Sequence, residues 1–173
     1  YALKTALHKI IKSHTDQGYW AVWGFIAKHD IDRYYEQDAT VLDVYSESPH
    51  GVDAHSFTPK SHQCGNYVKE GECYNREHSF PRSWFNSTDP MFSDIHQLFP
   101  TDGYVNEMRS NFAFGEVGKV QLQSRNGSKL GKSKTQGYRG IVFEPIDEFK
   151  GDIARAQLYM AVRYEDQIAS WEK

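Results

Sequence analysis

The stretch YNREHSFPRSWF at residues 74–85 contains the adjacent pair Glu77 and His78, and the rest of the sequence can be interpreted outward from it. Glu77 offers the oxygen ligand that a hard divalent cation prefers. His78 offers a base whose ordinary pKa lies near neutrality. Adjacent residues on a regular strand point to opposite faces, so the two side chains can serve one centre only at a strand end or a bulge. The alternative is a surface glutamate beside a hydrogen-bonded histidine. Such dipeptides are common, so spacing alone favours this alternative.

The sequence after this stretch predicts a second strand and then a helix. DIHQLF at 94–99 has the character of a short apolar strand, which Pro100 is expected to end. Thr101 or Asp102 can cap the helix that follows. The apolar residues that share one face of this helix are Val105, Met108 and Phe112. The predicted order is therefore strand, connection, strand, helix.

Polar side chains along this predicted helix are further candidates for a site. Asn106 has poor helix propensity, and its amide oxygen is either a neutral metal ligand or part of a solvated face. Asn111 is a competing ligand near the helix end. Arg109 shares a face with Asn106 because three residues separate them. It either reaches a phosphate oxygen and offsets charge in a transition state, or pairs with a surface acid.

The remaining pattern predicts one α+β domain over residues 1–173, a single mixed α/β unit without a repeat or linker. An amphipathic helix is expected at 3–14, a second, apolar helix packed on the first at 20–30, a strand at 40–47, and loop over 49–75. The apolar side of the first helix would hold Leu3, Ala6, Leu7, Ile10 and Ile11. Residues 141–171 predict a strand leading into a long helix, with Asp152 near its N-terminus. Its buried face would hold Ile153, Ala156, Met160 and Tyr164.

Composition limits the classes of function. The chain has 173 residues, 20.0 kDa and a net charge of −3, which argues against a domain that binds nucleic acid mainly by bulk charge. No apolar run approaches the roughly 20 residues of a membrane span, and a signal peptide is expected to be absent or already removed. The segment 118–140 is basic and expected to be flexible, either a phosphate-tracking surface or a solvated loop. Its cationic residues are Lys119, Arg125, Lys129, Lys132, Lys134 and Arg139.

The two cysteines and the scattered histidines leave alternatives open. Cys64 and Cys73 either form a disulfide, which would indicate an oxidising compartment, or remain free thiols. Their spacing does not match a zinc site. The loop histidines His50, His55 and His62 also match no zinc pattern, and His8, His14 and His29 are expected at helix surfaces or core edges. His96 is either a residue that supports a site or a buried structural histidine.

Several stretches together resemble one family. YNREHSFPRSWF and DIHQLFPTDGYVNEMRSNFAFGEV are similar to segments of the bacterial endonuclease I family of secreted and periplasmic nucleases. The preceding FTPKSHQCGNYVKEGEC, the short SKLG and the later GIVFEPIDEFKGDIARAQLYMAVRYED resemble it as well. The resemblance covers most of the chain and outweighs the argument from spacing alone.

This resemblance implies a ββα-metal (His-Me finger) site within the α+β domain. His78 would activate water, and Glu77 and Asn106 would bind Mg²⁺, with Mn²⁺ or Ca²⁺ as possible substitutes. Family members cut DNA, and often RNA, with little sequence preference and leave 5′-phosphate ends. The family also implies a secreted or periplasmic location and no obligate protein partner. The residues expected to contact substrate are Arg82, Asn111, Lys119, Arg125, Lys129 and Lys132.

Departures from the family pattern leave two questions. The chain is short after the Glu-His pair, where relatives carry a phosphate-contacting arginine, so Arg82 or Arg109 is expected to take that role. A polar tail usual in the family is absent after Lys173, which suggests truncation. The alternatives to a nuclease are an inactive nuclease-fold module that binds nucleic acid, and a zinc hydrolase built on the loop histidines.

Overall fold

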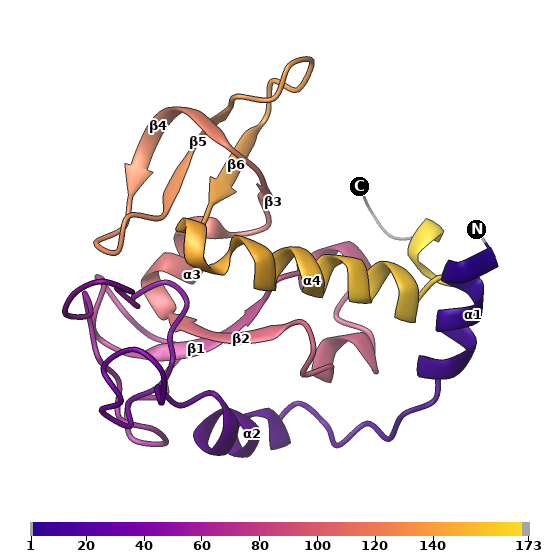
Figure 1. The fold of residues 1–173 in the computed structure, drawn as a ribbon, viewed down its shortest axis with the longest axis horizontal. Helices are drawn as coiled ribbons and strands as arrows, with labels where there is room; N and C mark the ends of the chain where they lie inside the picture. Colours follow the sequence, from indigo (N-terminus) through magenta and orange to yellow (C-terminus); the bar gives the residue numbers. More distant parts are fainter. Residues whose placement is uncertain (1, 171–173) are drawn as a thin grey trace.

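Two short strands and a helix form the centre of the computed structural model, which describes residues 2–170 (Figure 1). Strand β1 (Tyr74–His78) pairs antiparallel with β2 (Leu98–Asp102), and α3 (Gly103–Arg109) follows β2 directly. The Asp102 carboxylate accepts a hydrogen bond from the Val105 amide at 3.0 Å and caps α3. The predicted order of strand, connection, strand and helix is confirmed, with Asp102 as the cap. The outer residues of the predicted domain, Tyr1 and 171–173, lie outside the described range.

Pro100 lies inside β2, opposite Arg76, so the prediction that it ends the strand is wrong. Residues 94–97 form turns, and the strand begins four residues later than expected. A proline lacks the amide that a central strand would need, but it is tolerated on an edge. Both strands of this two-stranded sheet are edges, and the Pro100 carbonyl accepts a bond from the Val44 amide at 3.3 Å.

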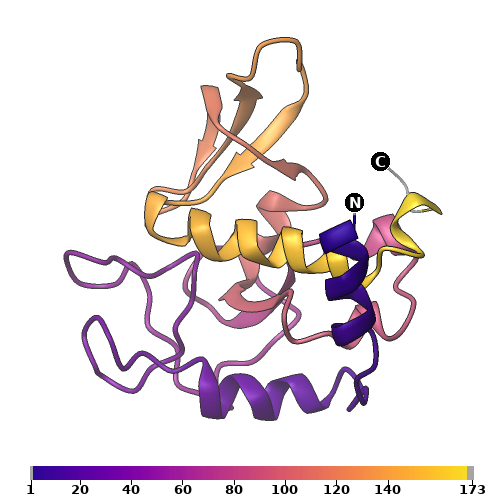
Figure 2. The ribbon, with the colours of Figure 1, turned by 45° about the vertical axis from the view of Figure 1, so that its right-hand side comes forward.

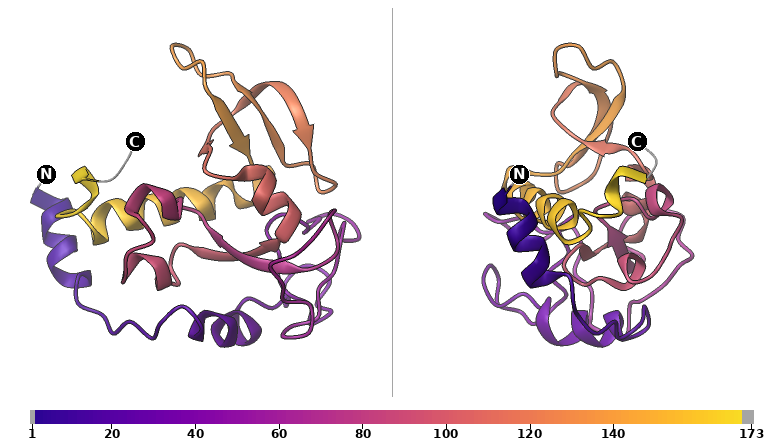
Figure 3. Two further views of the ribbon diagram at one scale, coloured as in Figure 1. Left: turned by 180° about the vertical axis from the view of Figure 1, so that it is seen from behind. Right: turned by 90° about the vertical axis from the view of Figure 1, so that its right-hand side faces the viewer.

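A four-stranded sheet extends away from this centre (Figure 3). Its strand order is β3-β6-β5-β4, formed by the segments Ala113–Phe114, Ile141–Glu144, Lys129–Ser133 and Val117–Gln123. β3 pairs parallel with β6, and the other pairs are antiparallel. The basic segment therefore contains an ordered hairpin, β4 with β5, where a flexible stretch was expected.

The long helix α4 (Asp147–Arg163) lies between the four-stranded sheet and the β1–β2 pair (Figure 1). It begins five residues before Asp152, with Asp147 and Glu148 in its first turn. Acidic residues are favourable there because the helix N-terminus carries partial positive charge. The predicted apolar face is confirmed, since its members are all buried: Ile153, Ala156, Met160 and Tyr164.

Three apolar clusters surround the centre. One joins the four-stranded sheet and the N-terminal half of α4 through Phe143 and Phe149. A second lies under α2 (Ala21–His29), where Ile26 belongs to the same cluster as Tyr74. The third joins the C-terminal half of α4, through Met160, to the connection between β1 and β2. That connection contains the 3₁₀ turns η1 (Arg82–Phe85) and η2 (Met91–Ser93), and a further 3₁₀ turn, η3 (Ile168–Ser170), follows α4.

Helix α1 (Ala2–Ile11) forms as predicted and lies against the end of α4 (Figure 2), but the face that it buries is not the predicted one. Its expected apolar side is largely exposed, with Leu3 at 73% and Ile10 at 75%. The buried residue is His8, whose Nδ1 lies 3.0 Å from the Val162 carbonyl at the end of α4. The carbonyls at a helix C-terminus lack partners within the helix, and an imidazole can satisfy them where a leucine cannot.

The strand predicted at 40–47 is wrong. Val41 makes one isolated bridge with Ile31, and the chain then turns around Asp43. The Asp43 carboxylate accepts the Tyr45 amide at 2.7 Å, and the Asp43 carbonyl accepts the amides of Ser46 and Glu47. Local bonds of this kind compete with a strand ladder. The β-branched and aromatic residues that suggested a strand are instead buried in a compact turn.

Candidate active site

A cleft of about 660 Å³ lies where β1, η1 and α3 meet. It gathers six of the residues predicted for a site, although they are distant in sequence: Glu77, His78, Arg82, Asn106, Arg109 and Asn111. His78 is the last residue of β1, so the pair stands at a strand end. Both side chains line the same cleft despite being adjacent.

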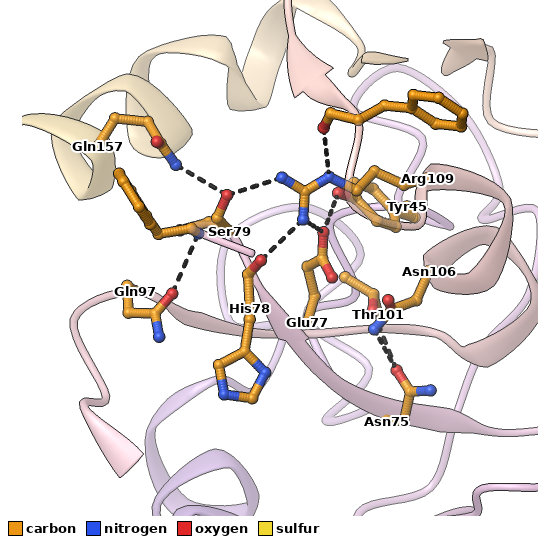
Figure 4. A network of polar contacts seen from close by, with 12 residues as sticks. Tyr45, Asn75, Glu77, His78, Ser79, Gln97, Thr101, Asn106, Arg109 and Gln157 are labelled. Atoms are coloured by element: carbon orange, nitrogen blue, oxygen red, sulfur yellow. Dashed lines mark hydrogen bonds and ion pairs between the residues drawn. The ribbon is translucent and has the colours of Figure 1, made fainter. Parts of the chain in front are cut away.

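Two neighbouring side chains hold Glu77 in place, and both contact the same carboxylate oxygen (Figure 4). Its Oε1 accepts a hydrogen bond from the Tyr45 hydroxyl at 3.0 Å and pairs with Arg109 Nη1 at 2.8 Å. Burial raises the pKa of Glu77 above its ordinary value, and the charge of Arg109 opposes that rise. Both bonds end on Oε1, which leaves Oε2 as the atom that a cation in the cleft would contact.

Asn106 is oriented by a residue that the sequence had not pointed to. Its Nδ2 donates to Asn75 Oδ1 at 2.7 Å, which fixes which end of the amide is the donor and leaves the Asn106 Oδ1 for a ligand. Thr101 Oγ1, opposite Asn75 in the strand register, also donates to Asn75 Oδ1, at 3.4 Å. A carboxylate and a carboxamide oxygen are ligands suited to a hard divalent cation, so the residues fit the metal that the family implies. Asn75 and Glu77 are two residues apart on one strand, and this was the signal available in the sequence.

The imidazole of His78 has its two nitrogens in different environments. Nε2 lies 2.9 Å from the Phe92 carbonyl, an acceptor, so Nε2 carries the proton. The neutral ring then has its lone pair on Nδ1. The ring stacks on Phe92, with centroids 5.0 Å apart and planes at 14°, and on Tyr19 at 5.6 Å. These contacts fix the direction of Nδ1, as a base that accepts a proton requires.

The electrostatics of the cleft keep His78 neutral. Burial lowers its pKa to about 4, although the hydrogen bond to Phe92 opposes the shift. The positive charges of Arg82, Arg76 and Arg109 lower the pKa further. At neutral pH the imidazole is therefore unprotonated and able to accept a proton.

Arg109 is 1% exposed, and its guanidinium is hydrogen-bonded to other groups of the protein. Besides Glu77, it donates to the carbonyls of His78 at 2.8 Å, Ser79 at 2.9 Å and Phe112 at 3.0 Å. Of the two roles considered for Arg109, this geometry favours pairing with an acid, and the acid is the buried Glu77 rather than a surface residue. The guanidinium thus fixes the end of β1 from which both Glu77 and His78 project.

Two further arginines border the cleft. Arg82 is exposed at the start of η1 and lines the opening. Arg76 is half-buried, with its guanidinium carbon 3.5 Å from the Tyr19 ring centroid and 4.1 Å from that of Trp23. Its Nη1 donates to the Tyr19 carbonyl at 2.6 Å, whereas its buried Nε has no hydrogen-bond partner. The sequence had not pointed to Arg76 or to the aromatic residues beside it.

The predicted contacts on the basic hairpin lie elsewhere. The residues that line the cleft do not include Lys119, Arg125, Lys129 or Lys132, which are carried by β4, β5 and the turn between them. Lys119 and Lys132 are exposed and directly opposite each other in the register. If these residues contact a substrate, the contact would therefore lie outside the cleft.

The disulfide between Cys64 and Cys73 is present, which rules out the free-thiol alternative. Cys64 lines the cleft, and Cys73 comes directly before β1. Among residues 2–170, one group of three His, Cys, Asp or Glu side chains is close enough together to bind a metal ion. Its members are all acidic, and none of the loop histidines belongs to it. His96 is exposed in a turn, its ring against Tyr159, so neither role considered for it holds.

The mixed α+β fold and a cleft that gathers a carboxylate, a carboxamide and a neutral imidazole agree with the family that the sequence resembles. A family model described as Endonuclease I matches residues 1–173, and the chain belongs to the endonuclease I family. It is 36% identical over 166 residues to an "Extracellular ribonuclease" of Bacillus amyloliquefaciens, covering 95% of this chain and 50% of that protein. A protein of the same description from Bacillus subtilis (strain 168) is 33% identical over the same shares.

A shorter match extends to a further relative. An "Endonuclease-1" of Buchnera aphidicola (strain Bp) is 31% identical over 81 residues, which is 47% of this chain and 32% of that protein. The chain spans about half the length of the Bacillus relatives. None of the helices in residues 2–170 is both long and apolar enough to cross a membrane.

Proposed function

We propose that the protein is a metal-dependent endonuclease that hydrolyses phosphodiester bonds of DNA, and of RNA, without sequence preference. The observation that carries the proposal is the meeting of Glu77, His78 and Asn106 in one cleft, each with a free atom of the right chemistry. The relatives' names support nucleic acid as substrate and RNA in particular.

Hydrolysis would begin with a water molecule beside His78. Nδ1 accepts a proton from the water, whose oxygen forms a bond to phosphorus while the bond from phosphorus to the 3′-oxygen breaks. The products are a 5′-phosphate and a 3′-hydroxyl, with the leaving oxygen protonated from solvent. A magnesium ion held by Glu77 Oε2 and Asn106 Oδ1 would stabilise the charge that develops on the phosphate and the leaving oxygen. Mn²⁺ or Ca²⁺ would take the same oxygen ligands.

The residues around Glu77, His78 and Asn106 would support this reaction. Tyr45 and Arg109 hold Glu77, and Asn75 holds Asn106, so the oxygens are in place before substrate binds. Arg82, exposed at the cleft, is the candidate for contact with a phosphate oxygen. Asn111 lines the same cleft and would contact the substrate backbone.

The test is a plasmid-nicking and RNA-degradation assay with magnesium, with zinc, and with chelator, on the protein and on His78→Ala. Cleavage that needs magnesium and is lost in His78→Ala supports the proposal. His96→Ala is the matched control, since that exposed histidine also packs on an aromatic ring and should leave activity unchanged. A folded protein that binds nucleic acid without cutting it would identify the inactive module, and restoration by zinc alone would identify a zinc hydrolase.

We also propose that the protein acts outside the cytoplasm, in the extracellular space or the periplasm. The Bacillus relatives are described as extracellular, and a disulfide persists in oxidising compartments. Fractionation of the source cells, followed by immunoblotting, checks this directly. Detection only in the cytoplasm would contradict it.

A further inference from the structure

A second group of acidic side chains lies away from the cleft, in the segment between α2 and β1. Carboxylate oxygens of Asp32, Glu36 and Glu47 all lie within 4.8 Å of one another. Asp53 is a fourth carboxyl group beside these three: its Oδ1 accepts the Ser48 amide at 2.8 Å, and its side chain is close enough to Glu47 to share a hydrogen bond when one of the two is protonated. None of the four is among the residues that line the cleft.

Glu47 distinguishes this group from an ordinary acidic surface. It is 1% exposed, and neither of its carboxylate oxygens accepts a hydrogen bond from any described donor. Burial, and then the negative charges of Asp53, Glu36 and Asp32, raise its pKa to about 9. No ion pair among residues 2–170 brings a lysine or arginine to any of the four carboxyl groups. A buried carboxylate without a partner is costly, and like charges around it add to that cost.

We propose that Asp32, Glu36, Glu47 and Asp53 form a second cation site, selective for Ca²⁺, that holds the segment between α2 and β1 in place. Calcium accepts six to eight oxygen ligands in flexible geometry, and carboxylates are its usual ones. Magnesium needs a near-ideal octahedron and keeps several waters, which suits a group of four carboxylates less well. The cation would give the unpartnered Glu47 oxygens the positive charge that they lack.

The surrounding contacts indicate what this site stabilises. Asp32 Oδ1 accepts the amides of Tyr34 and Tyr35, both at 2.9 Å, so the loop before the site is already wound around its carboxylate. On the other side, Glu47 comes two residues after Tyr45, whose hydroxyl bonds the active-site Glu77. The role is therefore structural: the cation orders the segment that delivers Tyr45.

Thermal unfolding of the chelator-treated protein, with and without calcium, tests the site. A calcium concentration about a hundredfold above the dissociation constant should raise the Tm by about 5–10 °C. Glu47→Gln should reduce this rise to the part that the catalytic cleft contributes, and Glu47→Gln combined with Asn106→Ala should remove it. In chelator the Tm of Glu47→Gln should equal or exceed that of the unmodified protein, because a like charge has been removed. Asp166→Asn, an exposed acid after α4, is the control that should keep the full response.

Two arms separate this site from the proposed catalytic one. In Asn106→Ala the calcium-dependent rise in Tm should persist, and terbium luminescence excited through the nearby tyrosines should still report binding. If Glu47→Gln fails to fold, Asp53→Asn replaces it with the same expectation. The proposal is overturned if calcium leaves the Tm of the unmodified protein unchanged, which would mean that Glu47 and Asp53 share a proton instead. It is equally overturned if the response is lost in Asn106→Ala and kept in Glu47→Gln.

Discussion

Arg109 and Arg82 are the two arginines expected from the sequence to meet a phosphate, and their surroundings separate their roles. Arg109→Gln removes the partner of a buried carboxylate, so we expect a loss of about 3–5 kcal/mol in stability. Arg82 is exposed, so Arg82→Gln should leave stability within about 0.5 kcal/mol and raise KM or lower kcat instead. Denaturant unfolding and steady-state cleavage of the two variants measure both effects. An Arg109 variant of full stability and reduced cleavage would return it to the role of phosphate contact.

Asn75 acts on the metal through Asn106. Asn75→Ala frees the Asn106 amide to rotate, so we expect magnesium affinity to fall about 10–100-fold. At saturating magnesium, kcat should return close to that of the unmodified protein if Asn75 acts only by orienting the Asn106 amide. Cleavage measured across a magnesium titration gives both numbers. Asn66→Ala, an exposed asparagine in the preceding loop, serves as the matched control.

His78 determines the acid limb of the pH profile. Its pKa of about 4 lies below that of a free histidine, so the base stays unprotonated as pH falls through the ordinary histidine range. We therefore expect log(kcat/KM) at saturating magnesium to stay level from pH 7 to about 5 and to decline as pH falls through about 4. A decline centred near pH 6.5 would show that His78 titrates as an exposed histidine.

Among the secondary-structure elements, the hairpin of β4 and β5 contains positively charged residues that lie outside the cleft. Lys119→Gln with Lys132→Gln removes two exposed charges that face each other in the register. If the hairpin contacts the phosphate backbone, the slope of log K against log salt should fall by about 2 for a duplex, and kcat should not change. Binding titrations at several salt concentrations measure the slope. Lys9→Gln with Lys12→Gln, on or next to α1, is a charge-matched control.

The same scale shows what the sequence could predict and what it could not. The order β1, β2, α3 was predictable because the periodicity and the Asp102 cap are local signals. The turn at Asp43 was not, because the apolar residues that suggest a strand are buried there for another reason. Glu77, His78 and Asn106 were recognisable from the resemblance. Tyr45 was not, since a hydrogen bond across 32 residues leaves no local pattern. Asn75 was marked only by its place two residues before Glu77 on the same strand, and its bond to Asn106 spans 31 residues.

For the whole molecule, α4 joins two of the three apolar clusters. Phe149 and Ile153 belong to the cluster under the four-stranded sheet, and Met160 belongs to the cluster beside the β1–β2 connection. Met160→Ala leaves a cavity at a fully buried position, so we expect a loss of about 2–5 kcal/mol. Circular dichroism and tryptophan fluorescence should show one shared transition, shifted down by about 4–20 °C. Leu158→Ala, 67% exposed on the same helix, should shift it little.

The packing of α1 on the end of α4 brings the beginning and the end of the described chain to one place on the molecule (Figure 2). Thr5 Oγ1 donates to the Glu165 carboxylate at 3.0 Å, and His8 bonds the last carbonyls of α4. Neither helix lines the cleft. Residues 2–170 could therefore be inserted into a loop of another protein, because the two connections to the host would lie side by side. The chain can equally be closed into a ring by a short linker and reopened at an exposed turn, with the reacting groups left as they are.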